Sequence, residues 1–128
     1  MTTELHLLIW AVILGLVHAV VTGQFTTAQH GMAYGLSSRD EKKELTGMGA
    51  RVQRAFSNYM QTFPFFVAAV LVAHVLGRHN GYTVWGANLY FWARLAFPFL
   101  YAFNVIGVRT GAFVVATLGI VLILVGLT

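Results

Sequence analysis

Cysteine is absent from this 128-residue sequence, and acidic side chains are confined to its first third. Without cysteine the chain can form no disulfide and offers no thiol of its own for catalysis, so any thiol chemistry needs a thiol from outside. No carboxylate side chain follows Glu44, although five arginines do: Arg51, Arg54, Arg78, Arg94 and Arg109. The sequence therefore lacks nearby anions for most of its cations.

Charge of either sign is scarce. Charged residues make up 9% of the chain and hydrophobic residues 58%, whereas soluble domains carry about 25% charged residues. A soluble domain this short could not bury so much apolar surface. The composition predicts a single all-α membrane domain over residues 1–128. The cations are spread through apolar sequence, which argues against nucleic acid as a partner.

Four apolar segments, at about residues 5–24, 63–76, 84–106 and 111–127, predict a bundle of four transmembrane helices. The second segment is short, because its 14 clean apolar residues cover about 21 Å of a hydrocarbon core of about 30 Å. We therefore expect its helix to extend upstream, bringing Gln61 and Asn58, with Arg54 at the limit, towards membrane depth. The polar stretch of about residues 26–49 is expected to be the main solvated loop.

The basic residues indicate the orientation of this multi-pass membrane protein. Four spans place both termini on one side. The connection between the first two helices and the last turn contain most of the basic residues: Arg39, Lys42, Lys43, Arg51, Arg54 and Arg109. The opposite side has only Arg78. The positive-inside rule then predicts that the long loop is cytoplasmic and that both termini lie on the opposite side.

Polar residues recur on one face of the second predicted helix. Their offsets of 0, 3, 7 and 10 form a single helical stripe: Arg51, Arg54, Asn58 and Gln61. Arg94 and Tyr101 lie seven residues apart, again on one face, in the same half of the membrane. Lipid would reject such faces, so we expect them to line the bundle interior, a partner subunit or the cytoplasmic interface.

Guanidinium groups cannot lose their charge at neutral pH, and a buried cation without a partner is costly. Three anions could meet them: a bound ligand with carboxylates, lipid phosphates, or the Glu41–Glu44 part of the loop. Arginines at helix ends can also reach lipid phosphates, which is the simplest interpretation of Arg78. The five histidines show no paired spacing typical of metal ligands, so no metal site is predicted.

The segment RVQRAFSNYMQTFP, residues 51–64, resembles the second-helix signature of the MAPEG superfamily, the membrane-associated proteins of eicosanoid and glutathione metabolism. That signature is roughly Arg-x-x-Arg-Ala-x-x-Asn-x-x-Glu with a proline shortly after. Thr22-Gly23-Gln24 is similar to the end of the family's first helix. Arg94 through Tyr101 to Arg109-Thr110 is similar to its third helix and the following turn. The resemblance implies a four-helix subunit assembled as a homotrimer.

The resemblance also implies glutathione as the cofactor, bound between neighbouring subunits on the cytoplasmic side. Arg109 would be the catalytic residue, closest to the thiol and favouring its thiolate. The other implied ligand-binding residues are Arg51, Arg54, Asn58, Gln61, Arg94, Tyr101 and Gln24. Three positions differ from the family pattern, since Gln61 replaces a glutamate, Thr26 a basic residue, and Phe97 a histidine or tyrosine. Each replacement removes a polar contact to a ligand.

Two hypotheses for function follow. The first is a glutathione-dependent transferase or peroxidase that acts on a small lipophilic electrophile, with the cofactor supplying the thiolate. The alternative is a non-catalytic membrane protein whose arginines bind lipid headgroups or another anionic ligand, or stabilise a trimer. A proton-coupled carrier is disfavoured because the predicted spans after the first contain no Asp or Glu.

Overall fold

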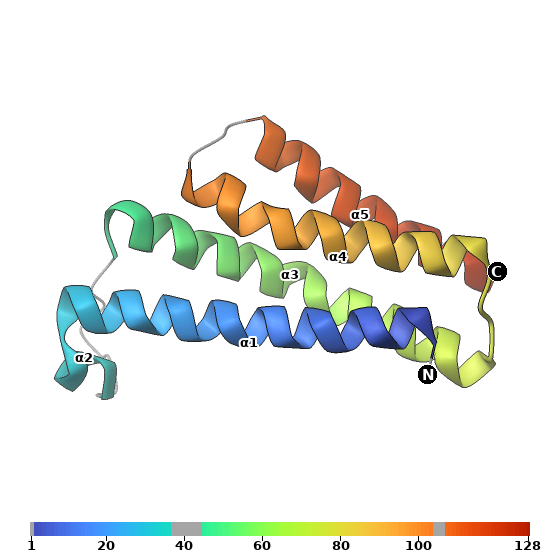
Figure 1. Cartoon of the computed structure of the whole chain (residues 1–128), viewed down its shortest axis with the longest axis horizontal. Coiled ribbons are helices and arrows are strands. Elements are labelled where there is room, and N and C mark those ends of the chain that lie inside the picture. Colours follow the sequence, from blue (N-terminus) through green and yellow to red (C-terminus); the bar gives the residue numbers. More distant parts are fainter. Residues whose placement is uncertain (1, 37–44, 104–106) are drawn as a thin grey trace.

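The computed structural model describes residues 2–36, 45–103 and 107–128, without the side chains of Val108 and Arg109. The regular secondary structure in these residues is helical (Figure 1). The helices are α1 (Thr3–His30), α2 (Met32–Leu36), α3 (Gly47–Leu76), α4 (Gly81–Ala102) and α5 (Val108–Leu127).

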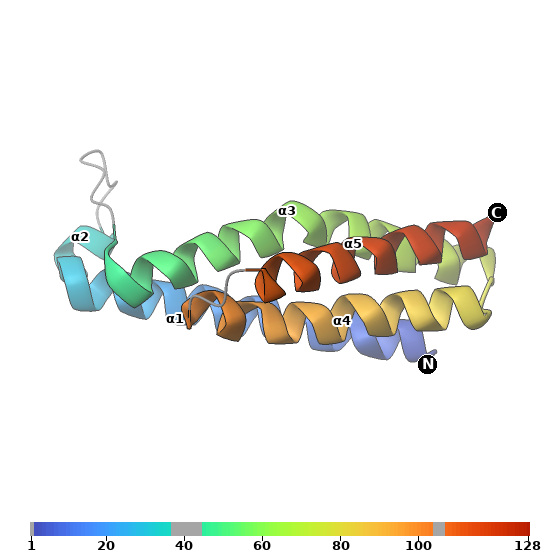
Figure 2. The same ribbon diagram turned by 90° about the horizontal axis from the view of Figure 1, so that it is seen from above.

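The four long helices lie side by side, and α2 lies at one end of them (Figures 1 and 2). Both chain termini lie at the other end, as the sequence predicts for four antiparallel helices. Helix α3 contacts α1, α4 and α5, and α4 has its most extensive contact with α5. We call the two ends of the molecule the α2 end and the terminal end.

In the part of the chain that the structure describes, three helices are long and apolar enough to cross a membrane: Thr3–His30, Gly47–Leu76 and Thr110–Leu127. These helices are consistent with an integral membrane protein. Helix α4 has 22 residues, long enough to span a bilayer, but it is not among the three because polar residues such as Asn88 and Arg94 interrupt its apolar sequence. That α4 also crosses the bilayer stays a prediction.

Helix α3 confirms the expected upstream extension. Its 30 residues correspond to about 45 Å of helix, and it includes Arg54, Asn58 and Gln61. The helix continues through Pro64. The polar stripe therefore belongs to the same continuous helix as the apolar run.

The polar stretch after the first span is more helical than the sequence suggested. Helix α1 continues to His30, six residues beyond the expected end of the span. The Thr26 hydroxyl donates to the carbonyl of Thr22 at 3.3 Å. The Gln29 side chain donates to the carbonyl of Thr46 at 3.0 Å and accepts from its N–H at 2.9 Å. Helix α1 therefore ends later than the first span was expected to end, whereas the start of α3 at Gly47 agrees with the expected end of the polar stretch at about residue 49.

The core between α3, α4 and α5 depends on aromatic stacking and on glycine. The rings of Phe66 and Tyr90 stack with centroids 4.1 Å apart, and both residues are fully buried. Helices α4 and α5 approach closely at Gly86 and Gly119, where a Cβ added to Gly86 would lie only 2.4 Å from the Gly119 carbonyl oxygen. This tight packing holds α4 in place against its neighbours.

Candidate functional site

Arg94 is the most deeply buried cation in the described part of the chain, with 0% of its surface exposed. Its guanidinium carbon lies 4.4 Å from the centroid of the Phe97 ring and 5.2 Å from that of Tyr59. Cation–π contacts offset part of the cost of burying a charge. Phe97 thus packs on a buried cation in this chain.

The hydrogen-bonding capacity of Arg94 is only partly used. Its Nη1 donates to Oδ1 of Asn58 at 2.9 Å, whereas Nε and Nη2 are buried without a hydrogen-bond partner. Nε and Nη2 share one edge of the guanidinium group, the edge that can hold a carboxylate through two parallel bonds. A buried donor without a partner costs about 1–3 kcal/mol, so the stability of the single chain does not explain this arrangement.

The bond from Arg94 also orients Asn58. Because Oδ1 accepts from Arg94, the amide NH₂ group of Asn58 is the part that remains able to donate. Asn58 is half-buried. Arg94 therefore orients the Asn58 amide so that its neutral NH₂ group can donate near the surface of α3.

Arg51 connects α3 to the end of α4. Its Nη1 donates to the carbonyl of Ala102 at 3.2 Å, and Ala102 is the last residue of α4. A cation at a helix C-terminus interacts favourably with the helix dipole. Arg51 thus fixes the start of the turn that leads to Arg109.

Arg54 is exposed, and its guanidinium carbon lies 5.8 Å from the centroid of the half-buried Tyr101 ring. The only acids outside the terminal end are Asp40, Glu41 and Glu44, which lie outside the described residues. No described carboxylate is therefore close to Arg51, Arg54 or Arg94. Arg51 and Arg54 therefore place positively charged hydrogen-bond donors at the α2 end.

The other predicted site residues are dispersed. Gln24 on α1 and Gln61 on α3 are exposed, and in the described contacts neither forms a hydrogen bond to another predicted site residue. Thr26 is buried and bonded within its own helix. Arg109 is the second residue of α5, but its side chain is not described by the structure.

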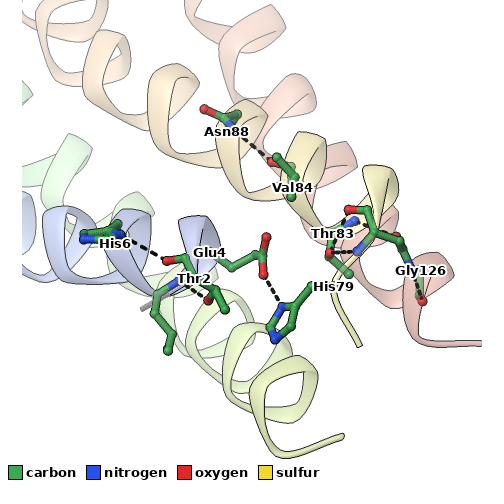
Figure 3. A network of polar contacts seen from close by, with 10 residues as sticks. Thr2, Glu4, His6, His79, Thr83, Val84, Asn88 and Gly126 are labelled. Atoms are coloured by element: carbon green, nitrogen blue, oxygen red, sulfur yellow. Dashed lines mark hydrogen bonds and ion pairs between the residues drawn. The ribbon is translucent and has the colours of Figure 1, made fainter. Parts of the chain in front are cut away.

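The polar groups at the terminal end are bonded to other protein groups (Figure 3). Glu4, 1% exposed, pairs with His79, whose side chain is 29% exposed. Arg78 donates to the carbonyl of Leu127 at 2.7 Å, and Asn80 donates to that of Gly126 at 2.9 Å. Asn80 and Thr83 form a capping box at the start of α4. These contacts join the ends of α1 and α5 to the α3–α4 turn.

Two residues near Arg94 were not predicted from the sequence. Tyr59 is 1% exposed and donates its hydroxyl proton to the carbonyl of Ala11. His18 packs against Phe56 at 5.2 Å between ring centroids, and its Nε2 lies 3.2 Å from the carbonyl oxygen of Val52. The periodicity of α3 could have indicated Tyr59, which follows Ala55 and Val52 on one face.

Hollows in the surface lie beside the arginines and do not contain them. The largest, about 920 Å³, lies between α4 and α5 and is lined by Trp85 and Trp92. A second, of about 440 Å³, lies between α1, α3 and α4, and it reaches Val52 and Ala102 next to Arg51. Neither hollow is lined by an arginine: Arg54 is exposed, Arg51 is half-buried and Arg94 is fully buried.

A comparison with known protein families gives the class of this chain. The model of the MAPEG family matches residues 5–128, nearly the whole chain. The protein therefore belongs to the MAPEG family, a family of membrane proteins generally associated with glutathione. Comparisons with curated proteins and with solved structures found no match.

Proposed function

We propose that this protein binds glutathione at the α2 end and promotes its reaction with a lipophilic electrophile, as a transferase or a peroxidase. The main support is the buried Arg94, which has two unpartnered N–H groups in a region where no carboxylate is described. Glutathione carries two carboxylates and an amine. Charge-assisted bonds to its carboxylates would supply the anions that the described chain does not.

The donors differ in how a ligand could use them. Arg54 is exposed and can contact a carboxylate directly. Asn58 offers its NH₂ group, and Arg94 beneath it contributes charge and fixes the amide. Tyr101 lies beside Arg54. A bound peptide would thus be held by several oriented groups, which lowers the entropic cost of positioning it.

When bound, glutathione would supply the thiol that the cysteine-free chain lacks. A nearby cation lowers the pKa of a thiol and raises the fraction of thiolate. We assign this role to Arg109 because of its position at the start of α5, close in sequence to the turn that Arg51 fixes. Gln24 and Gln61 are assigned to the ligand site by family resemblance.

We further propose that the working unit is a homotrimer in which α4 is the fourth transmembrane helix. In one subunit Arg54 and Asn58 reach the surface, so a neighbouring subunit would complete the pocket. The α2 end would face the cytoplasm, in agreement with the basic residues of the first connection. The electrophile would enter from the bilayer.

The second candidate function is the binding of anionic lipid headgroups by the same arginines. Arg54 favours it, since an exposed arginine near the end of a long helix can reach phosphates. The two ligands present different chemistry, because glutathione has two carboxylates whereas a lipid phosphate is a single compact anion. This difference can be tested directly.

The test is thermal unfolding of the purified protein in phosphatidylcholine nanodiscs with millimolar glutathione. A ligand that binds only the folded state raises stability by about 2.7 kcal/mol at a hundred times its Kd. We expect a concentration-dependent rise in melting temperature, and a much smaller rise with a glutathione diester. A rise with phosphatidylglycerol but none with glutathione would favour the lipid-binding function.

Catalysis is tested separately by conjugation of glutathione to a generic aryl halide. We expect Arg109→Ala to lower the rate while glutathione still raises the melting temperature. Equal rates for the wild type and Arg109→Ala would remove Arg109 from the mechanism. Binding without any conjugation would support the ligand site and refute the transferase activity.

A further inference from the structure

An open trough runs along the surface between α4 and α5, starting at the terminal end. It consists of two adjoining hollows of about 490 and 920 Å³, which share the side chain of Trp85. The first hollow is lined by the start of α4 and by Leu122 on α5. The second continues along α4 to Ala93 and reaches Gly111 on α5. The proposed glutathione site uses none of the residues that line this trough.

The length of the trough corresponds to one leaflet of a bilayer. It extends along α4 from Gly81 to Ala93, which is about 18 Å of helix. Half of a hydrocarbon core of about 30 Å is about 15 Å. Tyr82 and Trp85, 57% and 67% exposed, line the part next to the terminal end, and such aromatic side chains prefer the headgroup level of a membrane. An acyl chain in the trough would thus cross one leaflet.

The deeper hollow is apolar apart from Asn88, and the polar atoms of Asn88 are bonded within α4. Its NH₂ group donates to the Val84 carbonyl at 2.9 Å (Figure 3), and its Oδ1 accepts from the indole N–H of Trp92 at 3.3 Å. A polar occupant would lose its bonds to water here and find few new ones. This part of the trough therefore suits a hydrocarbon chain.

A cation lies at the terminal end of the trough. Arg78 donates to the carbonyl of Leu127, and Asn80, which lines the trough, donates to the carbonyl of the preceding residue, Gly126. Because the carbonyl oxygens of consecutive helical residues are only a few ångströms apart, the guanidinium group lies next to the wall of the trough. Arg78 is exposed and forms no ion pair in the described part of the chain. Its charge is thus available to an anion.

We propose that this trough binds an anionic phospholipid, with one acyl chain between α4 and α5 and its phosphate at Arg78. A guanidinium group matches phosphate oxygens in charge and geometry. A headgroup without an ammonium group is favoured, because Arg78 repels a second cation. The site lies at the opposite end from Arg54, which the second candidate function assigns to lipid headgroups. The proposal does not depend on glutathione binding.

The test uses phosphatidylglycerol with a diazirine in one acyl chain, added in trace amounts to phosphatidylcholine nanodiscs that contain the wild-type protein. After photolysis and proteolysis, mass spectrometry should find the label on peptides of the first half of α4 and of α5. Unlabelled phosphatidylglycerol should displace the label about fivefold more effectively than the same amount of phosphatidylcholine, which is the preference that one arginine near the membrane surface gives for an anionic lipid.

Two pairs of variants separate the headgroup contact from the chain contact. Arg78→Gln removes the charge but can still donate to the Leu127 carbonyl, and we expect it to lose the preference for phosphatidylglycerol. Arg54→Gln should keep that preference. Gly111→Trp places a ring in the trough where an added Cβ has no neighbour within 4 Å, and it should abolish the specific labelling. Gly23→Trp, at an equally open position of α1, should be labelled like the wild type.

Several outcomes would overturn the proposal: equal competition by the two lipids, label spread evenly over all helices, labelling unaffected by Gly111→Trp, or a preference that survives in Arg78→Gln. If Arg78→Gln does not fold, competition in the wild type and the Gly111→Trp variant still decide the question. A second subunit filling the trough would also overturn the proposal. Disulfide-linked dimers of Trp92→Cys, a variant whose cysteine has no other in its chain, in a sample that takes up no label would show this.

Discussion

The two ends of the helical bundle treat their polar groups differently. At the terminal end, Glu4 is paired with His79, and Arg78 donates to a backbone carbonyl at the end of α5. In the middle part of the bundle, Arg94 has one bond to Asn58 and two buried N–H groups without a partner. Each end has an arginine bonded to a carbonyl at the end of a helix, Arg78 at the terminal end and Arg51 at the α2 end, but among the described residues only the terminal end has a carboxylate.

This difference separates stabilising contacts from available binding groups. A buried polar group with its partner in place contributes to the folded structure, whereas an unpaired one lowers stability. The terminal contacts join three helices in one chain, so their loss should affect folding. The donors of the α2 end contribute less to the single chain, and their loss should affect binding.

The largest effect is expected for Arg94→Met. The substitution removes a buried cation and leaves an apolar side chain of similar length. Replacing buried charged groups with apolar ones is often neutral or stabilising, so the melting temperature without ligand should stay the same or rise. Glutathione affinity, measured by calorimetry in nanodiscs, should fall roughly a hundredfold, as expected for the loss of about 3 kcal/mol from a charged hydrogen-bonding group.

Arg94→Lys is the matched control for charge. It retains a cation but lacks the planar group that fixes the Asn58 amide, so its affinity should lie between those of the wild type and Arg94→Met. If Arg94→Met had a much lower melting temperature but bound glutathione normally, Arg94 would stabilise the fold and would not serve binding. Arg94 would then be a structural residue.

The second-largest effect is expected for Glu4→Ala, at the terminal end. Breaking a buried ion pair costs about 3–5 kcal/mol, but the His79 side chain is 29% exposed and can regain water. We therefore expect a loss of about 2 kcal/mol in the free energy of unfolding, measured by thermal denaturation. A double-mutant cycle with His79→Ala would isolate the pair. Glutathione affinity should change less than twofold, and a larger change would show that the two ends are coupled.

The sequence was sufficient to predict the long helices and the polar stripe. The short apolar run after Phe63 required an upstream extension, and α3 has it. The sequence could not show that Asn58 meets Arg94, because these residues are 36 positions apart and their contact depends on how α3 and α4 are rotated against each other. Helical periodicity gives a face, but packing selects its partner.

Polarity also misled the prediction of where α1 ends. Threonine and glutamine after residue 24 indicated a loop, yet the helix continues to His30, and the hydroxyls of Thr22 and Thr26 find acceptors in carbonyls one turn earlier. The same ambiguity applies to Gln24 and Gln61. Their exposure in one subunit is compatible with solvent, lipid or a neighbouring chain, and the sequence cannot distinguish these surroundings.

The smallest effect comes from two exposed arginines, one at each end. Arg54→Ala should leave stability within about 0.5 kcal/mol, as for most surface substitutions, and should weaken glutathione binding about tenfold because it removes one charge-assisted contact. Arg78→Ala should leave glutathione binding unchanged. It should lower stability by about 0.5–1 kcal/mol, since it removes one bond to the Leu127 carbonyl.

The pair is informative because the two substitutions are chemically identical and both residues are exposed. General loss of positive charge from the protein would weaken glutathione binding equally in both variants. A local site at the α2 end would weaken it only in Arg54→Ala. In another outcome, Arg54→Ala would bind glutathione as well as the wild type does but would lose the copurified anionic lipid that the wild type retains. Arg54 would then belong to the membrane surface, and Asn58 and Arg94 would remain as candidates for the glutathione site.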